Sequence, residues 1–294
     1  MMQISSSFQE IPELRVHYLR AGSGTPLVLL HGWPEFSGIW RHNMPALAAE
    51  YDVIAPDLRG FGRTEKLDAA TARKTTPEVL ADDLEALLDA LGLERVGIVA
   101  HDVGAYVSQT FARRHPDRVA GLVFFNCPYP GIGARWAAPD HLIEIWYQSF
   151  HRQPWAAELV GYNRDTCRIY FKHFLSHWAH DPHAFDAVLE EWVDNFMASD
   201  NLQGGFDWYE GFAAARIAMM KNPELAPGPI SAPTRVLWGG SDSVLRAEWS
   251  DRISEFFPNS EVSVVPEAGH FVHFERPDYA NAEMLRFFAG VMGG

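Results

Sequence analysis

Short, continuous apolar runs separated by helical segments constrain the fold of this 294-residue chain more than any other feature. The runs are Leu27–Leu30, Tyr51–Ala55, Val96–Ala100 and Gly121–Phe125. A run of this kind indicates a strand that is buried on both faces, as in a parallel sheet covered by helices. Leu14–Leu19 alternates instead, as an edge strand would. We therefore expect a mostly parallel, doubly wound α/β sheet with right-handed crossovers.

The helices between these runs have well-marked ends. Thr76 can cap the first helix with Pro77 at its first position, and Gly92 can end it. The apolar stripe of this helix consists of Leu80, Leu84, Leu87, Leu88 and Leu91. A second helix follows Gly104 and should stop before Pro116, because proline disfavours helical geometry in the residue that precedes it.

The strand pattern stops between residues 128 and 230, where only helical periodicities rich in aromatic residues occur. Strand patterns return at Thr234–Trp238 and Val262–Val265. A sheet that is interrupted and then resumed predicts one core domain carrying an insertion. We expect residues 1–127 and 231–294 to form the core and residues 128–230 to form a helical cap.

The composition excludes several classes of partner. The net charge is -14, which repels phosphate backbones and anionic lipid, so we expect neither nucleic acid nor a membrane as partner. No apolar run is long enough to span a bilayer, and Met1–Pro12 lacks the pattern of a secretory signal. Cys127 and Cys167 have no metal-ligand spacing and are expected to be reduced thiols of a cytoplasmic protein.

A carboxylate occupies the turn between a buried strand and a helix. The segment Ala100–Gly104 (AHDVG) has the small-x-nucleophile-x-small arrangement of a nucleophile elbow, with Asp102 where lipases and esterases carry serine. The turn is so tight that only small residues fit at its two flanking positions. A lone aspartate here could be a helix cap, but further residues of catalytic type accompany it.

Two of these residues follow in the order that elbow enzymes use, which is nucleophile, acid, histidine. Asp242 stands on the loop after the strand that ends at Trp238, and His270 stands on the loop after Val265. Loops at the carboxyl ends of parallel strands meet at one edge of the sheet, so these side chains can converge with Asp102.

These motifs together resemble the α/β-hydrolase family, and within it the branch of epoxide hydrolases and dehalogenases, over nearly the whole chain. His31–Pro34 (HGWP) joined to an elbow with Asp102 is a specific combination, whereas Asp57–Gly62 (DLRGFG) is common across the superfamily. The resemblance implies an α/β-hydrolase fold with an inserted helical cap.

The resemblance also implies roles for individual residues. Asp102 would be the nucleophile, His270 the base and Asp242 the acid that orients it. The backbone amides of Trp33 and Val103 would form the oxyanion hole.

Three residues are rivals for these roles. Some relatives carry the acid after the strand that precedes the cap, where this chain has the uncharged Asn126, so Asp242 keeps the role. His101 lies on the elbow and faces the wrong way, and His273 lacks a preceding small-residue turn, which leaves His270 as the base.

An aspartate nucleophile favours displacement at sp³ carbon over acyl transfer. The product would be an alkyl ester of Asp102, hydrolysed by water that His270 activates and through an oxyanion held by the two amides. An epoxide leaves as a basic alkoxide that needs a proton donor. By resemblance, two cap tyrosines supply it, and Tyr147 and Tyr209 stand at the expected positions.

The sequence therefore predicts an epoxide hydrolase that acts on a small apolar epoxide and needs no cofactor. Haloalkane dehalogenases usually carry tryptophan after the nucleophile, where this chain has Val103, and haloacetate dehalogenases carry arginines in the elbow, which this chain lacks. A dehalogenase with the same triad is the alternative. A non-catalytic ligand-binding protein of the same fold is a remote one.

His173, His177 and His180 would share one helical face, a spacing that zinc could use. Zinc enzymes of this spacing carry a glutamate between the first two histidines as the base, and none is present here. We expect packed or solvated histidines and no metal.

Overall fold

The computed structural model describes residues 3–67, 75–198 and 200–293, and these residues contain an eight-stranded sheet with the order β1-β2-β4-β3-β5-β6-β7-β8. The strands are β1 (Ser5–Ile11), β2 (Leu14–Ala21), β3 (Pro26–Leu30), β4 (Asp52–Pro56), β5 (Val96–His101), β6 (Val119–Phe125), β7 (Thr234–Gly239) and β8 (Ser260–Val265). From β4 to β8 along this order all pairings are parallel, whereas β1 and β2 pair antiparallel. The predicted α/β class is confirmed.

The expectation that Leu14–Leu19 forms the sheet edge is wrong. This segment belongs to β2, which lies between β4 and the additional strand β1. The sequence of β1, SSSFQEI, has four polar residues among its first five and is mostly exposed or half-buried, so it lacks the apolar pattern that identified the other strands.

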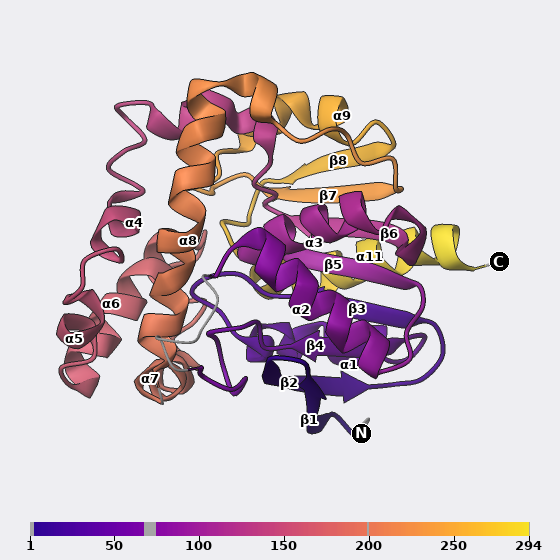
Figure 1. The fold of residues 1–294 in the computed structure, drawn as a ribbon, viewed down its shortest axis with the longest axis horizontal. Coiled ribbons are helices and arrows are strands. Elements are labelled where there is room, and N and C mark those ends of the chain that lie inside the picture. Colours follow the sequence, from indigo (N-terminus) through magenta and orange to yellow (C-terminus); the bar gives the residue numbers. More distant parts are fainter. Residues whose placement is uncertain (1–2, 68–74, 199, 294) are drawn as a thin grey trace.

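Helices cover both faces of the sheet (Figure 1). The helices outside the predicted insertion are α1 (Met44–Leu47), α2 (Pro77–Ala90), α3 (Val103–Arg114), α9 (Ile253–Phe256), α10 (Val272–Glu275) and α11 (Pro277–Met292), with 3-10 helices η1 (Ser37–His42), η2 (Pro116–Arg118) and η5 (Ala247–Arg252). The hydroxyl of Thr76 accepts a hydrogen bond from the Val79 amide at 3.3 Å and so caps α2 as predicted. Helix α3 ends at Arg114, before Pro116.

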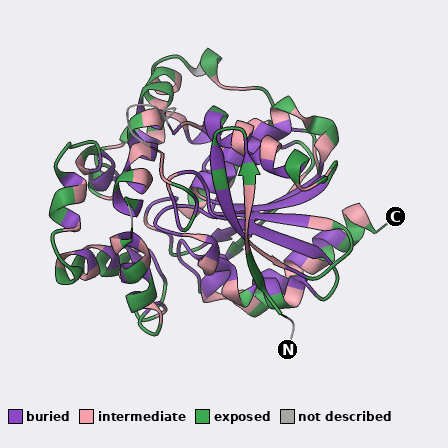
Figure 2. Cartoon of the chain, turned by 60° about the horizontal axis from the view of Figure 1, so that its bottom comes forward, coloured by how far each residue is buried: buried purple, intermediate pink, exposed green. Residues whose placement is uncertain are grey.

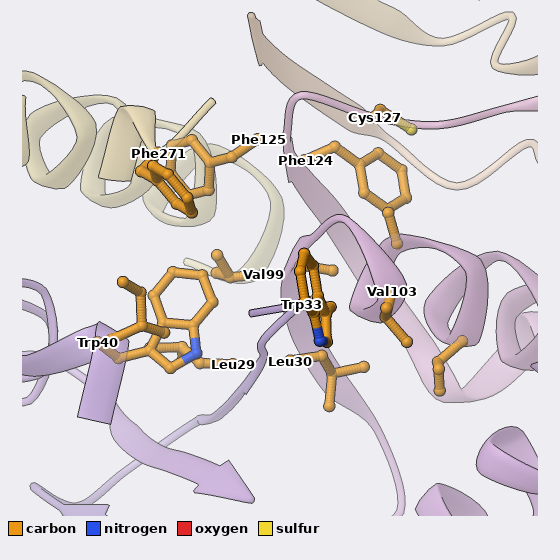
Figure 3. Packing of buried hydrophobic residues seen from close by; sticks show 14 of the residues in the cluster. Leu29, Leu30, Trp33, Trp40, Val99, Val103, Phe124, Phe125, Cys127 and Phe271 are labelled. Carbon is orange, nitrogen blue, oxygen red and sulfur yellow. The ribbon is translucent and has the colours of Figure 1, made fainter. Parts of the chain in front are cut away.

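The central parallel strands β3, β4, β5 and β6 are buried on both sides, as Figure 2 shows for the centre of the sheet, whereas the edge strand β8 is partly exposed. On one face, Gly97 and Gly121 let α11 pack closely, since a Cβ atom at Gly97 would lie 2.7 Å from the Phe288 ring. Side chains of β3, β5 and β6 pack together beside the start of α3 (Figure 3). This core holds the carboxyl ends of the strands in place.

The described residues between β6 and β7 form helices and no strand, as the sequence predicts. They are η3 (Pro130–Ala137), α4 (Trp146–Phe150), α5 (Ala156–Val160), α6 (Arg164–His177), α7 (Leu189–Met197), α8 (Asn201–Lys221) and η4 (Pro223–Leu225). Helices α4 to α8 gather beside the sheet, at the left of Figure 1. None of the helices in the described part of the chain is long and apolar enough to cross a membrane.

Candidate active site

Asp102 lies in a strained turn between β5 and α3. Its backbone has φ 45° and ψ −109°, a region that residues with a side chain rarely adopt. The turn brings α3 close to β3, and a Cβ atom at Gly104 would lie 2.3 Å from the Leu30 carbonyl oxygen. The small residue that the sequence places after the elbow is therefore required by this close approach.

A backbone amide holds one oxygen of the Asp102 carboxylate. The Trp33 N–H donates a hydrogen bond to Asp102 Oδ1 at 2.9 Å. The loop can come this near because Gly32 has no side chain: a Cβ atom there would lie 2.5 Å from the Asp102 Cβ. Val103 is the first residue of α3, where amides have no carbonyl partner within the helix. The other carboxylate oxygen, Asp102 Oδ2, is not bound by the Trp33 amide.

A buried acid and histidine lie at the neighbouring strand ends. The Nδ1 atom of His270 lies 2.7 Å from Asp242 Oδ2, and both side chains are almost entirely buried. The other oxygen, Asp242 Oδ1, accepts hydrogen bonds from the amides of Val244 at 2.8 Å and Leu245 at 2.9 Å. These donors fix the carboxylate, and the carboxylate in turn fixes the tautomer and the orientation of the imidazole ring.

Asn126 supports Asp242. It follows β6 with φ 44°, and its Nδ2 donates a hydrogen bond to Asp242 Oδ2. Its Oδ1 accepts a hydrogen bond from the Gly239 amide at 3.0 Å. The position that could have carried the acid is thus an amide that anchors the acid, a partnership that a single sequence does not reveal.

Charge controls the protonation of His270. Burial disfavours the imidazolium, but the charge and the hydrogen bond of Asp242 outweigh it and raise the pKa of His270 to about 9. The Asp102 charge contributes in the same direction. Burial would raise the pKa of Asp242, but the contact with His270 lowers it below its usual value. Asp242 and Asp102 therefore both favour the protonated form of His270.

A cavity of about 350 Å³ joins Asp102 to both predicted tyrosines. Tyr147 comes from α4 and Tyr209 from α8, and their ring centroids are 5.5 Å apart with the planes nearly perpendicular. The Tyr147 ring stacks on Trp33 at 5.2 Å. Burial raises the pKa of both phenols, so both stay protonated at neutral pH and can donate.

A second buried network, which the sequence reasoning missed, lies behind His270. Glu35 Oε1 lies 2.9 Å from His101 Nδ1 and 3.5 Å from His273 Nε2, and all three side chains are inaccessible to solvent. Glu35 Oε2 accepts a hydrogen bond from the Gly32 amide at 2.6 Å. Glu35 therefore binds His101 directly and lies beside His273, so both rival histidines face Glu35. A signal was available, since an acid three residues after Gly32 in an apolar loop needs a partner.

The negative charge of Glu35 also helps to raise the pKa of His270, and the rings of His101 and His270 are 4.5 Å apart. Among the described residues, Glu35, His101 and His273 are also the one group of at least three His, Cys, Asp or Glu side chains whose potential metal-ligand atoms all lie within 4.8 Å of one another. The histidines considered for zinc are arranged differently. Helix α6 ends at His177, whose Nε2 lies 2.7 Å from Glu144 Oε2, and His180 lies beyond the helix with Nδ1 2.9 Å from the Ser241 hydroxyl.

A mostly parallel sheet with an elbow after the central strand β5, an acid after β7 and a histidine after β8 defines an α/β-hydrolase. Its elbow carries a carboxylate in place of the usual serine. The chain belongs to the family described as alpha/beta hydrolase fold, whose model matches residues 25–277.

Within this family, the chain is similar to proteins that are named epoxide hydrolases. The chain is 34% identical over 285 residues to a soluble epoxide hydrolase of Corynebacterium sp. (strain C12), with 94% of each chain covered. It is 30% identical over 315 residues to epoxide hydrolase A of Mycobacterium tuberculosis, with 95% of each covered. Among solved structures, the ligand-free epoxide hydrolase CorEH superposes with a TM-score of 0.84 at 30% identity, covering 98% of this chain and 99% of the other.

Proposed function

We propose that this protein is an epoxide hydrolase that opens an epoxide to a vicinal diol through a covalent ester on Asp102. The observation that carries the proposal is the cavity shared by the Asp102 carboxylate and the protonated hydroxyls of Tyr147 and Tyr209. The nucleophile and two proton donors therefore face the same cavity. The names of the relatives support the same reaction.

In the first step, Asp102 Oδ2 attacks an epoxide carbon while Oδ1 stays on the Trp33 amide. The ring C–O bond breaks as the new ester bond forms. The departing oxygen takes a proton from Tyr147 or Tyr209, which avoids a free alkoxide. Residues 128–230 act here as a cap, since they contribute both tyrosines and close the cavity over the nucleophile.

In the second step, the ester is hydrolysed with His270 as base. Alkylation removes the negative charge of Asp102, which is one of the charges that raise the pKa of His270. The pKa of His270 therefore falls after alkylation, so the ring can return its proton, through water, to the tyrosinate left by the first step and can then take a proton from the attacking water. The hydroxide attacks the ester carbonyl carbon, and the amides of Trp33 and Val103 stabilise the oxyanion on Oδ1. Collapse releases the diol and restores the Asp102 carboxylate.

A single turnover of styrene oxide in heavy-oxygen water tests this route. The diol oxygen should come from Asp102 and be replaced there by water oxygen. We expect mass spectrometry to find the label in the peptide containing Asp102 and the first diol molecule unlabelled. Direct attack by water predicts the opposite distribution. An alkyl bromide and fluoroacetate, assayed for bromide and fluoride, report on the alternative dehalogenase reaction.

Asp242 and Asn126 should differ strongly in their effect on ester hydrolysis. Asp242→Asn removes the charge that holds the His270 tautomer, and a loss of about 10⁴-fold is expected by analogy with serine triads. Asn126→Ala removes one hydrogen bond to a charged group, which corresponds to roughly 10- to 100-fold. Single-turnover rates of ester decay measure both. A larger loss for Asn126→Ala would contradict the assignment of the acid.

A further inference from the structure

An arginine of α8 lines the same cavity. Arg216 lines the cavity that contains Asp102, and its Nε is buried without a hydrogen-bond partner. No carboxylate among the residues that the structure describes forms an ion pair with it. By contrast, Arg252, which lines a neighbouring cavity together with Arg216, pairs with Glu255, and Arg135 pairs with Asp251. Partial burial of a cation without an acceptor costs free energy. We therefore expect a ligand to supply the missing hydrogen-bond acceptor.

Aromatic rings hold the guanidinium of Arg216 in position. Its Cζ lies 5.2 Å from the centroid of the Trp136 ring and 5.9 Å from that of Phe212. Such contacts orient the planar group and shield it from water. The donors of the guanidinium are thereby left available for an acceptor that enters the cavity.

The charges of Arg216 and Asp102 act on the same part of the cavity. Burial and the Asp102 carboxylate raise the pKa of the Tyr147 hydroxyl, whereas Arg216 lowers it. Tyr106, which also lines the cavity, is subject to the same opposing influences. A molecule that reaches Asp102 is thus within the electrostatic field of Arg216.

We propose that Arg216 binds a carboxylate carried by the substrate, so that the preferred substrates are epoxides joined to an acidic group through an apolar spacer. This inference rests on the proposed function. Arginine suits the role because its planar fork can donate two parallel hydrogen bonds to a carboxylate. The net charge of -14 gives anions no general attraction to the protein, so a preference for them must come from a local site.

A binding experiment without turnover tests the site by itself. The probes are 4-phenylbutyrate and its neutral amide, 4-phenylbutanamide, followed by quenching of tryptophan fluorescence, since Trp136, Trp146 and Trp208 line the cavity. The wild type should bind the acid about 10- to 100-fold more tightly than the amide, as expected for a charged hydrogen bond. Arg216→Gln should remove this preference while amide binding, which reports on an intact cavity, is kept. Arg216→Lys should retain part of it.

Arg152 supplies a matched control. It lines the same cavity but is exposed, so solvent screens its charge and Arg152→Gln should keep most of the preference. Equal binding of acid and amide by the wild type would overturn the proposal. A preference that survives Arg216→Gln, or that is lost in Arg152→Gln instead, would overturn it as well.

Turnover separates this inference from the proposed function. Terminal epoxides of carboxylic acids with spacers of different length are compared with the corresponding amides by kcat/KM. The preference for the acid should appear at a matching spacer length and vanish in Arg216→Gln. Hydrolysis of the amides without any acid preference would overturn the role of Arg216 and leave the epoxide hydrolase intact. Acid-selective binding without hydrolysis of any epoxide would support Arg216 and overturn the proposed reaction.

Discussion

Replacing His270 with glutamine should stop the protein after alkylation, with one substrate molecule attached to Asp102. Glutamine can still donate a hydrogen bond to Asp242, so the buried carboxylate keeps a partner. It cannot, however, accept a proton from water. The loss of a general base corresponds to a fall of about 10²–10⁴-fold in ester hydrolysis. Intact-mass measurement after mixing with styrene oxide should find the protein heavier by one substrate, and peptide mapping should locate the mass on Asp102.

Asp102→Asn is the matched control for this experiment. Its side chain can keep the contact between Oδ1 and the Trp33 amide but is a far weaker nucleophile, so no adduct should form in it or in the double variant with His270→Gln. Rapid turnover by His270→Gln, or its slow turnover without any adduct, would contradict the two-step route. The first result would remove His270 as base, and the second would favour direct attack by water.

Loss of the Tyr147 and Tyr209 hydroxyls should nearly abolish alkylation. Tyr147→Phe and Tyr209→Phe each leave one donor facing the epoxide, and each should slow the step moderately. The double variant removes both proposed donors, and the expected loss is about 10²–10⁴-fold, which is the usual contribution of a general acid. Stopped-flow measurement of tryptophan fluorescence follows the step directly, because Trp33 stacks on Tyr147 at 5.2 Å.

An alkyl bromide provides the contrast for these variants. Bromide leaves without a proton, so any displacement of bromide should be much less affected by the double substitution than epoxide opening. Near wild-type epoxide opening in the double variant would exclude both tyrosines from the mechanism. Equal losses for both substrates would point to damaged packing around Trp33, since both tyrosine rings lie against it.

Most of the fold could be predicted from local patterns in the sequence. The doubly buried strands β3, β5 and β6 are recognisable because each contains a continuous apolar run, and α2 is recognisable because its cap and its apolar stripe agree. Strand β1 escaped because it lies at the sheet edge, where exposure permits a polar sequence and removes the signal. Helix α6 ended one turn earlier than the histidine spacing suggested, since helix ends depend on packing as well as on sequence.

The candidate site also has a part that the sequence alone predicts and a part that only the tertiary structure shows. The elbow at Asp102 and the order of Asp242 and His270 can be read from the chain, because a tight turn and a strand end impose local residue choices. The anchoring of Asp242 by Asn126, the network around Glu35 and the place of Arg216 beside the cavity of Asp102 depend on residues far apart in sequence. Hydrogen bonds and ion pairs act over a few ångströms, so only the folded backbone decides which of many distant polar groups meet and which are left free for a ligand.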